Sequence, residues 1–185
     1  MAKTARQASD RKTIDKVFVL LGVVMTATLI VVGGITWHAS NFAFTSVRTE
    51  LAAQKVYFPP LGSPGLAPAE FPDLQQYAGQ LVDNGPKAKA YANGFIGRHL
   101  EKVAGGLTYS EVSALAMKDP TNAKLIGQKA TLFQGETLRG LLLGDGYAYW
   151  TFGSIAQYAA IAAFSGAALM AVLVAFGVRH LSKQK

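Results

Sequence analysis

The sequence predicts an all-α membrane protein in which two transmembrane helices flank a small helical extracytoplasmic domain. Two long apolar runs without a charged residue lie at residues 17–37 and 155–178. A helix of this length rises roughly 30 Å, which is the thickness of the hydrocarbon core of a bilayer. Residues 38–154 between the runs show helical periodicity and no convincing strand alternation. These observations together predict the fold class.

The basic residues indicate how the chain crosses the membrane. The formal net charge is +7, and residues 1–16 and 179–185 hold eight basic and two acidic residues. Residues 38–154 hold ten basic and nine acidic residues. Because basic residues mark the cytoplasmic ends of spans, we expect both tails in the cytoplasm, touching anionic lipid headgroups, and the middle domain outside. No basic patch is visible in that domain, which argues against nucleic-acid binding.

The first apolar run is predicted to be an uncleaved anchor. Its core is longer than the apolar region of a typical signal peptide, and residues 35–40 lack an A-x-A cleavage pattern. Aromatic residues follow the first run and precede the second, as in an interfacial belt, with a quinone or lipid pocket as the alternative. These residues are Trp37, Phe42, Phe44, Tyr147, Tyr149, Trp150 and Phe152.

The middle domain begins with a helical continuation of the first span. Residues 41–56 contain neither proline nor glycine, and apolar residues recur there at helical spacing. Residues 58–68 then form a Pro/Gly arm, FPPLGSPGLAP, which is either a linker or an extended segment lying along a partner.

Several shorter helices follow the arm. We expect one over residues 72–82 and a second over residues 86–104, in which Gly94 and Gly97 indicate close packing or a bend. The Thr108-to-Glu111 spacing fits a capping box, so a third helix starts there and ends near Met117. A fourth, capped by Thr121 or Asn122, runs to about Leu143, and residues 144–146, Gly-Asp-Gly, are expected to form a turn before the second span.

The sequence offers little that could carry catalysis. It has no cysteine, and its three histidines, His38, His99 and His180, have no supporting metal motif. The G-x-S-x-G motif is missing. Glu101 and Glu136 each have an arginine three residues away on a helix, which favours solvated ion pairs. We therefore predict no catalytic residue, metal site, cofactor or identifiable small-molecule substrate, and no enzymatic activity.

The spans do carry small residues at spacings suited to helix contact, because small side chains let helix backbones approach closely. In the second span, alanines recur every four residues from Ala159 to Ala175. Three interpretations stay open: contact with a partner helix, packing of the two spans on each other, or chance in an alanine-rich run. The candidate helix-contact face comprises Gly22, Thr26, Ala159, Ala163, Gly166, Ala167 and Ala171.

Two segments resemble a family of small actinobacterial membrane proteins that have two spans around an extracytoplasmic helical domain. They are residues 87–117, KAKAYANGFIGRHLEKVAGGLTYSEVSALAM, and residues 134–143 with the YAYW of residues 147–150. Some members are labelled aromatic ring-opening dioxygenases, but the metal ligands for that chemistry are absent here. In size and topology the chain also resembles accessory subunits of the actinobacterial cytochrome bcc–aa3 respiratory supercomplex, which implies electron transport.

These observations favour a non-catalytic accessory or assembly subunit of a larger bacterial membrane complex, with a respiratory complex implied by the resemblance. The expected partners are membrane lipid and other membrane-protein subunits. The alternative is an extracytoplasmic ligand-binding or sensory membrane protein. The two tails of the chain, of 16 and 7 residues, are too short to form a cytoplasmic output domain, which argues against signalling.

Overall fold

The computed structural model describes residues 2–183, and the side chains of residues 11–183. The protein is 83% helical, and the described residues form no strand, only an isolated antiparallel bridge between Tyr57 and Leu81. The predicted all-α class is confirmed. The chain divides into two compact units, a helix-pair unit (Met1–Asn41 with Ser154–Lys185) and a middle unit (Phe42–Gly153).

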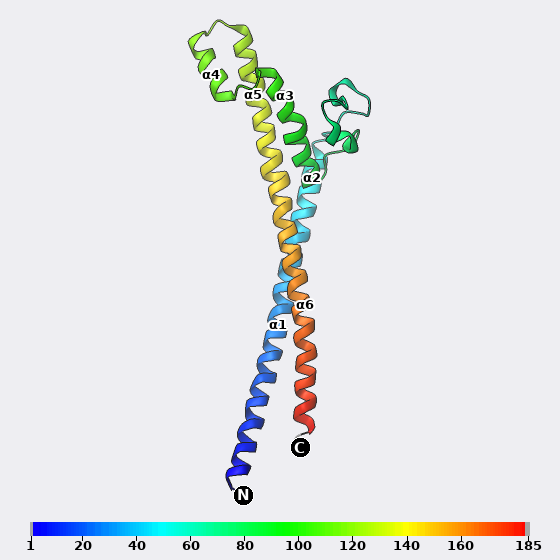
Figure 1. The fold of residues 1–185 in the computed structure, drawn as a ribbon, viewed down its shortest axis with the longest axis vertical. Coiled ribbons are helices and arrows are strands. Elements are labelled where there is room, and N and C mark those ends of the chain that lie inside the picture. Colours follow the sequence, from blue (N-terminus) through cyan, green and yellow to red (C-terminus); the bar gives the residue numbers. More distant parts are fainter. Residues whose placement is uncertain (1, 184–185) are drawn as a thin grey trace. The chain divides into compact units, whose positions relative to one another are not determined.

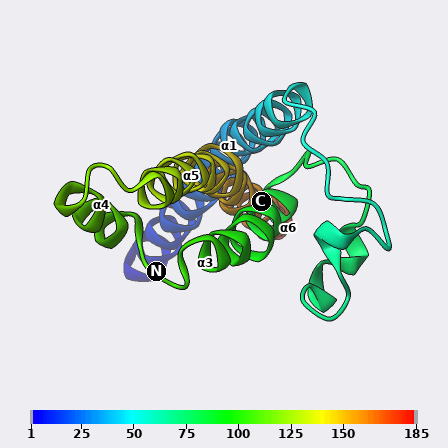
Figure 2. The ribbon, with the colours of Figure 1, turned by 90° about the horizontal axis from the view of Figure 1, so that it is seen from above.

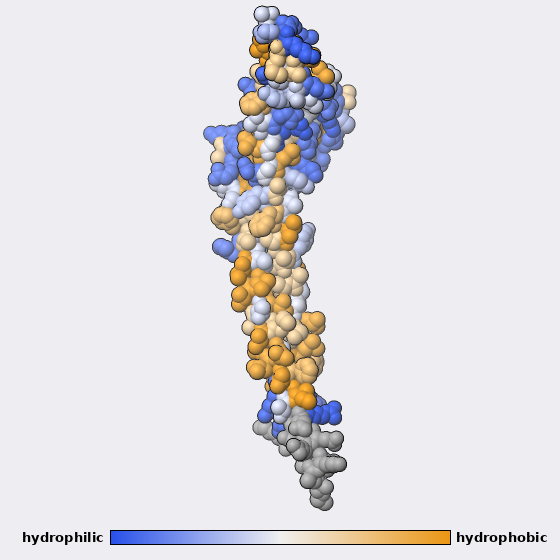
Figure 3. Space-filling view, turned by 90° about the vertical axis from the view of Figure 1, so that its left-hand side faces the viewer, coloured by the Kyte–Doolittle hydropathy of each residue, from blue (hydrophilic) through white to orange (hydrophobic). Residues whose placement is uncertain are grey.

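The helix-pair unit is built from the two long helices of the chain, α1 (Ala2–Ala53) and α6 (Tyr149–Lys183). Both are long and apolar enough to cross a membrane, as residues 17–37 and 155–178 predicted. Figure 1 shows α1 in blue to cyan and α6 in orange to red. In Figure 3 apolar side chains cover most of the visible face of this unit. Of the predicted basic tails, Lys185 and the side chains of Lys3 and Arg6 lie outside the described residues.

The middle unit contains the remaining elements, which Figure 2 shows from above. Two short 3₁₀ turns, η1 (Pro64–Leu66) and η2 (Pro72–Tyr77), lie in and after the Pro/Gly arm. The helical elements that follow are α2 (Gly85–Lys89), the π-helical η3 (Ala90–Gly97), α3 (Arg98–Ala104), α4 (Tyr109–Lys118), α5 (Ala123–Leu141) and the π-helical η4 (Leu142–Ala148).

Several local predictions are confirmed by the helix ends. Helix α1 continues beyond the first apolar run to Ala53. The capping box at α4 is complete, since the Thr108 side chain accepts from the Glu111 N–H and the Glu111 carboxylate accepts from the Thr108 N–H. The same contact lowers the pKa of Glu111, because backbone donation favours its charged form. Asn122, rather than Thr121, caps α5 by accepting from the Leu125 N–H.

The prediction of a turn at residues 144–146 is wrong. These residues belong to η4, so the helix runs without a break from α5 into α6, over Ala123–Lys183. The Tyr149 N–H points back to the Gly144 carbonyl, which keeps the backbone hydrogen-bonded through the glycines. A Cβ on Gly146 would lie 3.0 Å from the Ala88 Cβ. Glycine therefore serves close packing against α2 here and does not end the helix.

Two other expectations change in detail. The helix predicted over residues 72–82 is only the 3₁₀ turn η2, which ends at Tyr77 before the chain becomes irregular. The helix predicted over residues 86–104 is present as α2, η3 and α3 in succession. Its internal Gly94 lies against the Leu74 side chain, where a Cβ would come within 2.9 Å of Cδ2. The close packing that this glycine indicated is therefore present.

The middle unit has two apolar clusters. The larger joins α1 to the arm, η3 and η4, and its fully buried members include Phe58, Leu66, Phe71 and Leu142. The smaller joins α3, α4 and α5 through Leu100, Ala104, Val112 and Leu132. Phe44 and Trp150, two of the aromatic residues predicted at a membrane interface, pack against each other in this unit with ring centroids 4.4 Å apart.

Candidate functional site

The helix-pair unit is held together by a regular seam that is rich in small residues. The least exposed positions on α1 alternate in steps of three and four residues, which is the heptad pattern of paired helices: Val19, Gly22, Thr26, Leu29, Gly33, Thr36 and Ser40. Helix α6 shows the same alternation at Ala156, Ala160, Ala163, Ala167, Met170, Val174 and Gly177. Each helix therefore presents one continuous face to the other.

The glycines of this seam show the direction of pairing. A Cβ on Gly22 would lie 2.7 Å from Cγ2 of Val174, and one on Gly177 would lie 2.7 Å from Cγ2 of Val19. A Cβ on Gly33 would lie 2.8 Å from the ring of Phe164. Higher numbers on α1 meet lower numbers on α6, so the helices pair antiparallel. The glycines permit backbone approach that alanine would obstruct.

The predicted helix-contact face is divided between the seam and the outside of the pair. Gly22, Ala163 and Ala167 are buried in the seam, and Thr26 is half-buried in it. Gly166 is half-buried beside the seam, whereas Ala159 and Ala171 are exposed. The Thr26 hydroxyl donates to the Gly22 carbonyl at 2.7 Å, so the helix itself satisfies that polar group. The seam positions are spaced alternately three and four residues apart. A row of alanines spaced always four apart therefore leaves the seam after one or two members.

The outer surface of the pair is apolar on both helices. Leu20, Val31 and Ile35 of α1 are 60–65% exposed, and Leu169 and Phe176 of α6 are 63% and 64% exposed. At one end of the seam His180 Nε2 lies 3.9 Å from an Asp15 carboxylate oxygen. This surface has the composition that lipid or an apolar partner helix requires.

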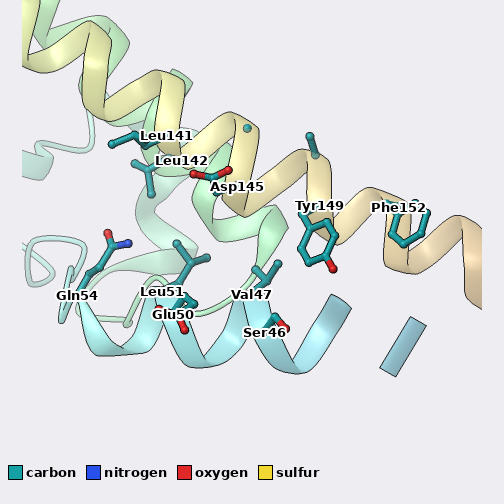
Figure 4. Close-up of a pocket in the computed structure, with 12 residues that line it drawn as sticks. Ser46, Val47, Glu50, Leu51, Gln54, Leu141, Leu142, Asp145, Tyr149 and Phe152 are labelled. Atoms are coloured by element: carbon teal, nitrogen blue, oxygen red, sulfur yellow. The ribbon is translucent and has the colours of Figure 1, made fainter. Parts of the chain in front are cut away.

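The middle unit contains a groove of about 750 Å³, which lies within the usual size range of small-molecule sites. One wall is α1, and the other is the end of α5 with η4 and the start of α6 (Figure 4). Val47, Leu51 and Leu142 form its floor and are at most 5% exposed. The rim is formed by Ser46, Glu50, Gln54, Leu141, Gly144, Asp145, Ala148, Tyr149 and Phe152.

The groove's polar groups come from both walls. Ser46 and Glu50 lie on α1, and Gln54 follows its last residue at the same four-residue spacing. Asp145 lies on η4 across the groove (Figure 4). None of the twelve lining residues is basic. Sequence reasoning missed this site. The polar residues beside the buried Val47 and Leu51 could have indicated one wall. The opposite wall could not be predicted, because residues 144–146 were expected to form a turn and not a helix.

Two ion pairs fasten the arm region to α3. Arg98 donates to both carboxylate oxygens of Asp73, at 2.8 and 3.0 Å, and Lys102 pairs with Glu70. The Phe71 ring lies between these pairs and is stacked on the His99 ring, with centroids 5.3 Å apart. The hydrogen bond from Arg98 lowers the pKa of Asp73, and that from Lys102 lowers the pKa of Glu70.

The candidate polar residues outside the groove have structural contacts. His99 Nδ1 lies 2.8 Å from the Phe95 carbonyl oxygen. Glu136 pairs with Arg139 as predicted, at 2.8 Å, whereas the arginine near Glu101, Arg98, pairs with Asp73. Arg139 also donates to Asn93, which links α5 to η3. Among the described residues, no group of three or more histidine, aspartate or glutamate side chains could hold a metal ion.

No protein-family model, curated protein or solved structure matches this chain. The resemblance of residues 87–117, 134–143 and 147–150 to actinobacterial two-span proteins therefore stays a prediction.

Proposed function

We propose that this chain is a two-span membrane protein that acts as a non-catalytic accessory or assembly subunit of a larger bacterial membrane complex. In this proposal α1 and α6 cross the membrane, both termini are cytoplasmic and the middle unit is extracytoplasmic. The resemblance to accessory subunits of the cytochrome bcc–aa3 supercomplex suggests a respiratory complex as the first to test.

The observation that carries the proposal is the apolar outer surface of the helix pair. The seam uses one face of each helix, yet the remaining faces carry large exposed apolar side chains, and the two apolar runs contain no charged residue. Transport paths through a membrane are marked by ionisable residues, which these runs lack. The pair is therefore suited to anchoring and lateral contact.

The proposal is tested by co-purification with matched variants. Ala168→Trp enlarges an exposed position of α6, whereas Lys118→Ala changes an exposed position of α4. We expect the wild-type chain and the Lys118 variant to purify in mild detergent with the same membrane-protein partner, and the Ala168 variant to reach the membrane without it. An absorption spectrum of the purified complex tests for haem. A monodisperse species containing this chain alone would remove the main support.

The topology has a separate test. Reporter fusions at both termini should score cytoplasmic, and an insertion near Pro64 should score external. The opposite pattern overturns the orientation proposed from the basic tails, without bearing on the antiparallel pairing of α1 and α6.

A second candidate function, ligand binding by the middle unit, is favoured by the groove. Its buried apolar floor and sparse polar rim are the usual features of small-molecule sites. Binding of a small molecule there is compatible with an accessory role, since neither requires a catalytic residue. A ligand that raises the melting temperature of the chain supports this candidate.

A further inference from the structure

We propose that the groove of the middle unit binds a small amphipathic organic cation, such as a quaternary or protonated amine with an apolar body. The inference rests on the ligand-binding candidate and is independent of the accessory-subunit proposal. It is carried by three features of the groove: the sign of its charges, its aromatic side chains and the depth of its apolar floor.

The charge of the groove is acidic from both sides. Glu50 projects from α1 and Asp145 from η4, and no lysine, arginine or histidine is among the lining residues. A carboxylate on each wall attracts a cation into the groove and repels an anion. Both side chains are exposed, so each contributes modestly, as surface ion pairs do. Together they give the groove a preference for cations.

The aromatic side chains reinforce that preference. Tyr149 and Phe152 line the same groove, and their rings are stacked with centroids 5.9 Å apart and planes 3° apart. Aromatic faces attract organic cations, and quaternary ammonium groups are commonly recognised in this way. In Figure 4 the Tyr149 ring projects from α6 toward the α1 wall.

The floor requires that the cation carry an apolar body. Val47, Leu51 and Leu142 are buried beneath the groove, and a compact hydrated metal ion would leave this apolar surface unused. The wall has room beside it, because a Cβ on Gly144 would meet no atom within 4 Å and Ala148 is exposed. The groove thus matches a molecule with one charged end and several apolar groups.

The test uses two ions of the same shape and opposite charge, tetraphenylphosphonium and tetraphenylborate. The full-length chain is placed in phosphatidylcholine nanodiscs, and bound probe is measured by equilibrium dialysis, with empty nanodiscs as the background. We expect saturable binding of the phosphonium and none of the borate. Glu50→Gln and Asp145→Asn should each weaken binding about threefold, and the double variant about tenfold.

Two controls separate charge from shape. Glu101→Gln removes one carboxylate of the middle unit that does not line the groove, and its affinity should stay within about twofold of wild type. Ala148→Trp fills the groove without changing its charge, and it should abolish saturable binding. The melting curve of each variant is compared with that of wild type to check that it folds. Glu50→Gln and Asp145→Asn should fold normally, because both side chains are exposed and neither change alters a buried contact.

The outcomes distinguish this inference from the function on which it rests. Saturable binding of both ions, or equal phosphonium affinity in the wild type and the double variant, overturns the preference for cations but leaves ligand binding standing. No saturable binding of either ion overturns the inference, whereas the ligand-binding candidate is decided by its own melting-temperature test. Loss of binding in Glu101→Gln equal to that in Glu50→Gln also overturns the inference, because it shows a diffuse charge effect.

Discussion

Two glycines of α5 make a matched pair that tests the packing of the middle unit. Gly127 and Gly135 lie in the same helix, but a Cβ on Gly127 would meet no atom within 4 Å. A Cβ on Gly135 would lie 2.5, 2.8 and 3.0 Å from three side-chain carbons of Leu100. The substitution Gly→Ala is chemically identical at the two sites, so the difference in unfolding free energy isolates the contact with α3.

The magnitude follows from the geometry. Alanine is favoured over glycine inside a helix by about 1 kcal/mol, so Gly127→Ala should stabilise the protein by about that amount. At Gly135 the same gain is offset by a clash, because carbon atoms normally approach to about 3.5–4.0 Å and Leu100 is only 6% exposed. Such overpacking costs about 1–3 kcal/mol. Gly135→Ala should therefore unfold at a temperature about 2–12 °C below Gly127→Ala.

The assay is thermal unfolding of the full-length chain in mild detergent, followed by circular dichroism. A double-mutant cycle sharpens it, because Leu100→Ala alone leaves a cavity and costs about 2–5 kcal/mol. The methyl group that Gly135→Ala adds would fill part of that cavity, so this substitution should become stabilising in the Leu100→Ala background. If Gly135→Ala and Gly127→Ala raise the melting temperature equally, the packing of α5 on α3 described above is refuted.

The remaining predictions concern the arm, a helix cap and the seam. Lys102 lowers the pKa of Glu70, and Arg98 lowers the pKa of Asp73. These ion pairs therefore stabilise the folded chain fully above the ordinary carboxyl pKa values, and the stabilisation is lost as the pH falls through the lowered pKa values. The melting temperature of wild type should exceed that of Glu70→Gln/Asp73→Asn by a margin that shrinks below about pH 4, and a margin that stays constant contradicts the role of these pairs. Thr108→Ala should cost about 1 kcal/mol by removing the α4 cap, whereas Ser110→Ala in the same helix should cost much less, as denaturant titration can show. The chain lacks cysteine, so the double variant Gly22→Cys/Val174→Cys should form a disulfide within one chain on oxidation. The control Val24→Cys/Val172→Cys, whose positions face outward, should not. A disulfide in the control and none in the first variant, seen on a non-reducing gel, rules out the antiparallel seam.

The sequence was sufficient to predict elements that depend on local interactions. The capping box depends on two residues three positions apart, Thr108 and Glu111. The apolar runs of α1 and α6 are continuous in the sequence. Both patterns are therefore visible without knowledge of the fold. The glycines of η4 were misinterpreted, because a Gly-Asp-Gly triplet favours a turn unless tertiary packing holds it. Here Gly146 lies against Ala88 of α2, far away in the sequence.

The candidate sites show the same limit. Small residues in the spans indicated helix contact, but the position of the seam depends on which residues of α1 face α6. Ala159 and Ala171 share the four-residue spacing of Ala163 and Ala167 and yet lie outside. The groove was invisible for a related reason, since Glu50 and Asp145 are 95 positions apart and only the folded unit brings them to one site.

The antiparallel seam also imposes an order on biosynthesis. Val19 meets Gly177, so about 158 further residues must be synthesised before the first helix finds its partner. At a translation rate of about 5–20 residues per second, that interval lasts roughly 8–30 s. In the proposed two-span topology, the glycine face of α1 would enter the bilayer unpaired during this interval. The nascent chain thus has a period in which another helix, an insertase or a chaperone can occupy the face that α6 later covers.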